Sequence, residues 1–130
     1  MVSAPVLFDT SILIDYLSSR PQARIEMDAH SDRAISVVTW MEVLAGTTAE
    51  DESKTRAFLF NFQSLPLTPQ VAERAVEIRR ADIEGDRKIR LPDAIIQATA
   101  QLSGRVLSTR NTRDFPEGTP GVRIPYVLSV

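Results

Sequence analysis

The chain has 130 residues, of which 43% are hydrophobic and 25% are charged. This length suits one domain with its own core, and the composition excludes an intrinsically disordered chain. No apolar run approaches the ~20 residues of a membrane-spanning helix, and the lack of cysteine excludes disulfides, thiolate zinc sites and cysteine nucleophiles. The formal net charge of −2 argues against a protein that coats nucleic acid by bulk attraction.

In the first half of the chain, short β-branched runs alternate with helical stretches. The run Val6–Phe8 is continuously apolar and ends at Asp9, as a strand covered on both faces does. The elements predicted after it are a helix that Thr10 and Ser11 can cap, a helix beginning at Pro21, a strand over 34–37, and a helix over about 38–45 that ends at Gly46.

The second half continues the alternation after a polar, acidic stretch over 47–55. The predicted elements are first a helix whose apolar side includes residues 58–62, an edge strand over 65–67 and a helix from Thr68 and Pro69 to near Gly85. A helix from Pro92 to Gly104 follows, with Ile95, Ile96, Thr99 and Leu102 facing inward. The last two elements are a strand over 105–109 and a strand over 122–124. Strands separated by helices predict a parallel sheet with helices on both faces, in one α/β domain over residues 1–130.

The charge is unevenly distributed along the chain. Residues 79–123 carry a net charge of +3, so the remainder carries −5. A solvated helix face explains most such asymmetries, and a local anion-binding surface is the alternative.

Several common chemistries lack the residues they need. None of the five glycines is spaced as a dinucleotide fingerprint or a phosphate loop. His30 is the only histidine and no nucleophile elbow is present, which argues against a Ser-His-Asp hydrolase.

Four carboxylates stand in unusual places, although each has an ordinary explanation. Asp9 ends an apolar strand and could simply cap the next helix. Glu42 borders the apolar side of its helix, where a salt bridge to an arginine would satisfy it. Asp93 is at a helix start that favours acids, and Asp114 suits a turn after a strand.

A single arrangement competes with these four explanations. In a parallel sheet the strand ends and the neighbouring helix starts converge at one edge, where open α/β folds bind ligands. Two carboxylates about 4 Å apart repel by roughly 4 kcal/mol at an effective dielectric near 20, so converging acids need cations or must hold protons. Oxygen-only ligation favours Mg²⁺ or Mn²⁺ over zinc, and such ions can activate water and clamp a phosphodiester.

The same residues lie in four blocks of sequence that resemble the motifs of PIN-domain ribonucleases. The blocks are Val6-Leu7-Phe8-Asp9-Thr10-Ser11, Trp40-Met41-Glu42-Val43-Leu44-Ala45-Gly46, Leu91-Pro92-Asp93-Ala94-Ile95-Ile96-Gln97-Ala98-Thr99-Ala100 and Thr109-Arg110-Asn111-Thr112-Arg113-Asp114-Phe115. They span nearly the whole chain in the family's order, and they are most similar to those of VapC-type toxins of toxin–antitoxin pairs.

The resemblance implies a three-layer α/β/α fold around a central, mostly parallel sheet of four to five strands. It also implies Mg²⁺- or Mn²⁺-dependent cleavage of RNA, usually structured RNA such as tRNA or rRNA. Asp9, Glu42 and Asp93 match the family's acidic triad, Asp114 matches its more variable fourth position, and Thr10, Ser11, Thr109 and Asn111 match supporting polar groups. Arg87, Lys88, Arg90, Arg110 and Arg113 are our candidates for RNA contacts.

The resemblance further implies a homodimer that a VapB-type antitoxin silences, with the antitoxin tail over the active-site groove. Residues 1–9 lack the basic segment and the cleavable apolar stretch of a signal peptide, so we expect a cytoplasmic protein.

Two other functions stay open at this point. A receiver-type module also uses a strand-end aspartate and Mg²⁺, but it normally needs a late lysine, and this chain has only Lys54 and Lys88. A catalytically silent RNA-binding or scaffold protein could keep the fold, although all four acids are present.

Overall fold

The computed structural model describes residues 4–85 and 88–128. The elements within these ranges are, in chain order, β1 (Val6–Phe8), α1 (Thr10–Leu17), α2 (Pro21–Asp28), β2 (Arg33–Ser36), α3 (Val37–Ala45), α4 (Glu52–Leu59), β3 (Gln63–Leu65), α5 (Pro69–Glu84), α6 (Leu91–Leu102), β4 (Val106–Ser108) and β5 (Val122–Arg123). The predicted alternation of strands and helices is therefore confirmed.

The strands form one sheet in the order β3-β2-β1-β4-β5, and every pair is parallel. This order differs from the 2-1-3-4-5 order of receiver-type domains, which argues against that alternative. The strand β1 is at the centre, paired with β2 through Val6 and Arg33 and with β4 through Val6 and Val106.

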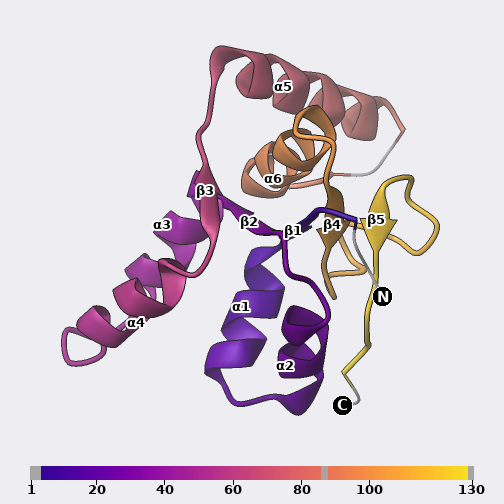
Figure 1. Cartoon of the computed structure of the whole chain (residues 1–130). Helices are drawn as coiled ribbons and strands as arrows, with labels where there is room; N and C mark the ends of the chain where they lie inside the picture. Colours follow the sequence, from indigo (N-terminus) through magenta and orange to yellow (C-terminus); the bar gives the residue numbers. More distant parts are fainter. Residues whose placement is uncertain (1–3, 86–87, 129–130) are drawn as a thin grey trace.

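Helices cover both faces of the sheet. In Figure 1, α5 and α6 lie on one face and α1 and α2 on the other. Alternate residues of β1 point to opposite sides, so Leu7 packs into the core under α5 and α6, whereas Val6 and Phe8 pack into the core under α1. All three side chains are fully buried, as expected of a central strand covered on both faces.

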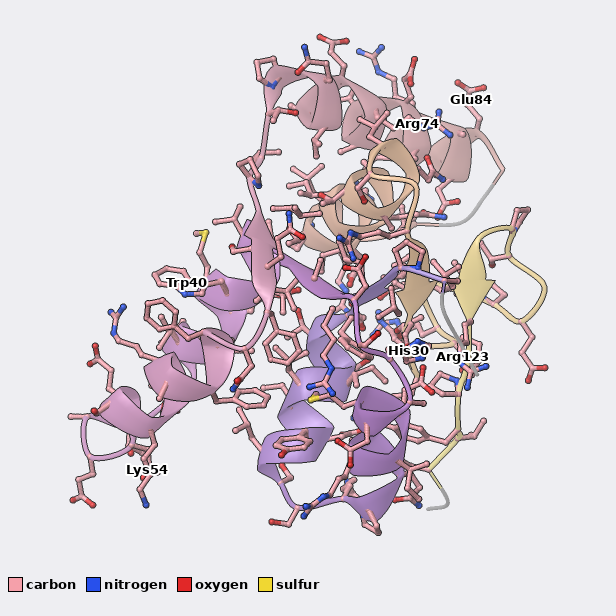
Figure 2. All side chains as sticks on the ribbon, in the orientation of Figure 1. His30, Trp40, Lys54, Arg74, Glu84 and Arg123 are labelled. Atoms are coloured by element: carbon pink, nitrogen blue, oxygen red, sulfur yellow. The ribbon has the colours of Figure 1, made fainter. Side chains whose placement is uncertain are left out.

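The helices α3 and α4 form an arm beside the β3 edge of the sheet (Figure 1). Trp40 and Lys54 are both on this arm (Figure 2), and Trp40 is partly buried against the core on the side of α1. The Arg56 guanidinium stacks over the Trp40 ring, 5.6 Å from its centroid. The arm contributes Val43 and Leu59 to the core on the side of α1, so it is anchored at its base.

Four details of the sequence prediction were wrong. The residue that caps α1 is Asp9 rather than Thr10 or Ser11, which are the first two residues of the helix. The helix expected around 58–62 runs instead over Glu52–Leu59, so it begins inside the polar stretch, where Glu52 and Arg56 form an ion pair one turn apart on its exposed face. The edge strand ends at Leu65 because Pro66 has no N–H for the next ladder bond. Leu102, expected inward, is the last residue of α6 and is 53% exposed in a surface cleft beside Leu65.

Among the described residues, no helix has both the length and the apolar character to cross a membrane.

Two leucine substitutions test this packing. Leu7→Ala removes a fully buried side chain from the central strand, so we expect it to lower the free energy of unfolding by about 2–5 kcal/mol. Leu102→Ala makes the same change at a half-exposed position and should cost less than about 1 kcal/mol. Urea unfolding of both variants measures the difference, and equal losses would contradict the assigned packing.

Candidate active site

The carboxyl end of β1 places Asp9 at the start of α1. Asp9 caps this helix, with its Oδ2 accepting hydrogen bonds from the Ser11 backbone N–H at 3.3 Å, the Ser11 hydroxyl at 2.7 Å and the Thr109 hydroxyl at 2.8 Å. The residue is only 2% exposed, and its Oδ1 is buried with no hydrogen-bond partner. A buried carboxylate oxygen without a partner is costly, and a bound cation is one group that would satisfy it.

Glu42 joins the site from α3 through threonine hydroxyls. The Thr10 hydroxyl donates to Glu42 Oε1 at 2.7 Å, and it also lies 2.9 Å from the Thr39 hydroxyl. No arginine or lysine of the described chain pairs with Glu42, so the salt bridge that would explain this acid in ordinary terms is absent. Glu42 is exposed at the rim of the site, while Asp9 is buried at its floor.

Asp93 and Asp114 share one arginine. Arg90 precedes α6, and its guanidinium lies 3.1 Å from Asp93 Oδ2 through Nε and 2.8 Å from Asp114 Oδ2 through Nη2. Asn111 supports the second acid, because its side-chain amide donates to Asp114 Oδ2 at 2.9 Å. Arg90, which we expected to contact RNA, therefore also offsets part of the negative charge of the site.

The proximity of these acids changes their protonation. Burial, followed by the charges of Asp9 and Asp114, raises the pKa of Asp93 to about 7 in spite of the opposing charge of Arg90. Burial also disfavours ionised Asp114, but hydrogen bonds from Asn111 and Arg90 hold the pKa of that carboxyl below its ordinary value. Burial and the two neighbouring carboxylates therefore together favour a protonated Asp93, in spite of Arg90.

A pocket of about 410 Å³ lies beside these side chains, and of the four acids only Glu42 and Asp93 line it. Its lining includes most of the residues predicted for the site, namely Thr10, Ser11, Glu42, Arg90, Asp93, Arg110, Asn111 and Arg113. Thr109 is buried beneath it and donates to Asp9. Lys88 is exposed just before α6, and Arg87 lies outside the described residues.

The donor set fits a hard divalent cation. Within residues 4–85 and 88–128, however, no three His, Cys, Asp or Glu side chains are placed so that together they could hold a metal ion. Arg90 ties Asp93 to Asp114, and Thr10 holds Glu42. Even so, the unpartnered Asp9 Oδ1 and the raised pKa of Asp93 both indicate negative charge that is not neutralised, and all the donors are oxygens.

Sequence reasoning missed two buried carboxylates close to this site. Asp15 in α1 pairs with Arg110, and Glu26 in α2 pairs with Arg123. A signal for Asp15 was available, because it interrupts the apolar face formed by Ile12 and Leu13. Its partners come from distant parts of the chain and carry no such signal.

Known proteins are similar to this chain in sequence and in fold. The family model described as PIN domain matches residues 6–117. Ribonuclease VapC10 of Mycobacterium tuberculosis is 30% identical over 114 residues, which are 85% of this chain and 86% of that protein. The chain belongs to the PIN-domain family and is of the VapC type.

Solved structures agree with the assignment of this PIN domain. A chain of the toxin-antitoxin complex from Klebsiella pneumoniae is 44% identical, with a TM-score of 0.86, over 95% of this chain and 99% of that one. The structure of FitAcB from Neisseria gonorrhoeae aligns with a TM-score of 0.80 at 22% identity, over 95% and 99% of the two chains, and so supports the fold alone. The α/β/α fold expected from the resemblance is confirmed.

The pKa of Asp93 predicts how stability depends on pH. A carboxyl whose folded pKa is above its unfolded value binds more protons when folded, so stability falls as pH rises from about 4 to about 7. Asp93→Asn has no carboxyl to titrate at this position, so it removes this fall in stability. In EDTA, we expect the variant to be more stable than the wild type by about 1–2 kcal/mol at pH 8 and nearly equal to it near pH 4.

Urea unfolding at both pH values measures this difference, with Asp28→Asn as the control because Asp28 is an exposed aspartate on α2. A gain for Asp93→Asn that is the same at both pH values would contradict the charge repulsion described above.

Proposed function

We propose that this PIN domain is a divalent-metal-dependent endoribonuclease that acts as the toxin of a toxin–antitoxin pair. The observation that carries the proposal is that Glu42 and Asp93 line one pocket, while the charges of Asp9 and Asp114 both act on Asp93 and Asp9 keeps a buried oxygen without a partner. The 30% identity to Ribonuclease VapC10 supports the same activity.

Asp9, Glu42 and Asp93 would hold Mg²⁺ or Mn²⁺, and Asp114 would complete or orient the set. A divalent ion supplies Lewis-acid chemistry to a phosphodiester and to the attacking water. The residues of the chain then have separate tasks. Ser11 and Thr109 fix the Asp9 carboxylate, Thr10 fixes Glu42, and Asn111 fixes Asp114. We expect products with a 5′-phosphate and a 3′-hydroxyl.

Positive side chains at the rim suit an RNA backbone. Arg110 and Arg113 line the pocket, and Arg90 lies between its two acids. Guanidinium groups make paired, charge-assisted hydrogen bonds with phosphate, so we assign RNA contacts to these three arginines and to the exposed Lys88. Arg87 remains a candidate from sequence. The expected substrate is a structured RNA such as tRNA or rRNA, cleaved in the cytoplasm.

A VapB-type antitoxin is the proposed partner. A second pocket of about 410 Å³ lies between α1 and the α3–α4 arm, and Ile14 lines both this pocket and the acidic one. A peptide that follows the arm would therefore reach the acids. The 44% identical chain in a toxin-antitoxin complex supports this partner, and we expect the toxin to form a homodimer.

Removing one acid tests the proposed activity. Asp9→Asn keeps the size of the side chain but removes its charge, so we expect cleavage of RNA to fall at least about 100-fold. EDTA should abolish cleavage by the wild type, and added Mn²⁺ should restore it. Gel analysis of total bacterial RNA measures both effects, with Asp28→Asn as an exposed control.

Cleavage by folded Asp9→Asn at the wild-type rate, or cleavage that persists in EDTA, would contradict the proposed function.

A further inference from the structure

The carboxylate of Asp15 is buried close to the pocket but is not one of the four acids described above. Asp15 is on α1 and is 2% exposed. Arg110, which follows β4, donates to it twice, from Nε to Oδ2 at 2.5 Å and from Nη2 to Oδ1 at 2.9 Å. The Tyr126 hydroxyl donates to Oδ2 at 2.9 Å from the segment that follows β5. Three distant parts of the chain therefore meet at one carboxylate.

Stability alone is a weak explanation for this network. Burying an ion pair costs desolvation energy that the attraction between the charges often fails to exceed. The arginine of the pair is also not sealed in the core, because a third of its side chain is exposed and it lines the acidic pocket. The network fixes a cation at the wall of the site.

The geometry leaves part of the guanidinium available. Asp15 occupies the edge formed by Nε and Nη2, and Nη1 has no hydrogen-bond partner among the described residues. A guanidinium is planar, so fixing one edge also fixes the direction of the N–H groups on the other. Burial raises the pKa of Tyr126, which keeps its hydroxyl protonated as a donor to Asp15.

We propose that Asp15 and Tyr126 are positioning residues that hold Arg110 with its remaining N–H groups ready to bind a phosphate of the RNA backbone. This inference rests on the proposed function, since it assigns the Arg110 contact to the same substrate. It adds that the orientation of Arg110, and not only its charge, determines binding.

A second pair in the same molecule provides a matched control. Glu26 is 3% exposed and accepts two hydrogen bonds from Arg123, each at 2.9 Å. Figure 2 shows Arg123 beside His30, which also contacts Glu26. Glu26 also accepts a hydrogen bond from Ser108 of β4 at 2.8 Å, and among the described residues no hydrogen bond joins Glu26 or Arg123 to Asp9, Glu42 or Asp93. Glu26→Gln therefore removes the same charge as Asp15→Asn without changing a residue of the pocket.

The experiment measures binding and cleavage of unfractionated bacterial tRNA. Binding is measured in EDTA, and kcat and KM are measured with Mn²⁺. We expect Asp15→Asn to weaken binding and raise KM by about tenfold while kcat stays within about twofold. The double variant with Arg110→Ala should bind no more weakly than Arg110→Ala alone, because Asp15 acts through Arg110. Glu26→Gln should leave binding and KM unchanged.

The loss of one negative charge by itself predicts the opposite result, tighter binding of RNA. Tighter binding by Asp15→Asn, equal effects of Asp15→Asn and Glu26→Gln, or additive losses in the double variant would overturn the inference. Tyr126→Phe keeps every charge and should weaken binding about threefold only when Arg110 is present, so it decides the question if Asp15→Asn does not fold. A wild type that neither binds nor cleaves RNA would instead reject the proposed function.

Discussion

The repulsion among carboxylates at one edge of the sheet is the constraint on which the rest of this structure depends. Asp9, Asp93 and Asp114 are all buried there, where water screens their charges poorly. Arg90 offsets part of the charge, and burial together with the neighbouring acids raises the pKa of Asp93 to about 7. The buried Asp9 Oδ1 still has no partner. Because Arg90 offsets only part of this charge, the arrangement is suited to bind a further cation.

Parallel topology explains how residues 100 positions apart in the chain reach the same edge of the sheet. The strands β1 and β4 are neighbours, so their carboxyl ends place Asp9 beside Thr109, whose hydroxyl donates to it. The helix α6 then begins at the same edge and brings Asp93. Two ion pairs with buried carboxylates, Asp15 with Arg110 and Glu26 with Arg123, tie α1 to the segment that follows β4 and α2 to β5.

Much of the fold and the main site residues followed from sequence, because they depend on local pattern. Asp9 could be selected from the sequence because it directly follows a fully apolar strand. Asp93 could be selected because Pro92 indicates the start of the helix that carries it. The sharing of Arg90 between Asp93 and Asp114 could not be predicted, because Asp114 reaches it through the loop after β4. The Tyr126 contact depends on the path of the segment after β5, and the exposure of Leu102 depends on the cleft beside Leu65.

Calorimetric titration with Mn²⁺ at pH 6.5, in two buffers of different ionisation enthalpy, tests most directly whether the acidic pocket is a cation site. At this pH Asp93 is largely protonated. We therefore predict saturable binding with release of protons to the buffer, and loss of this binding in Asp9→Asn. Absence of saturable binding by the folded wild type at millimolar Mn²⁺, or unchanged binding by Asp9→Asn, would contradict the account.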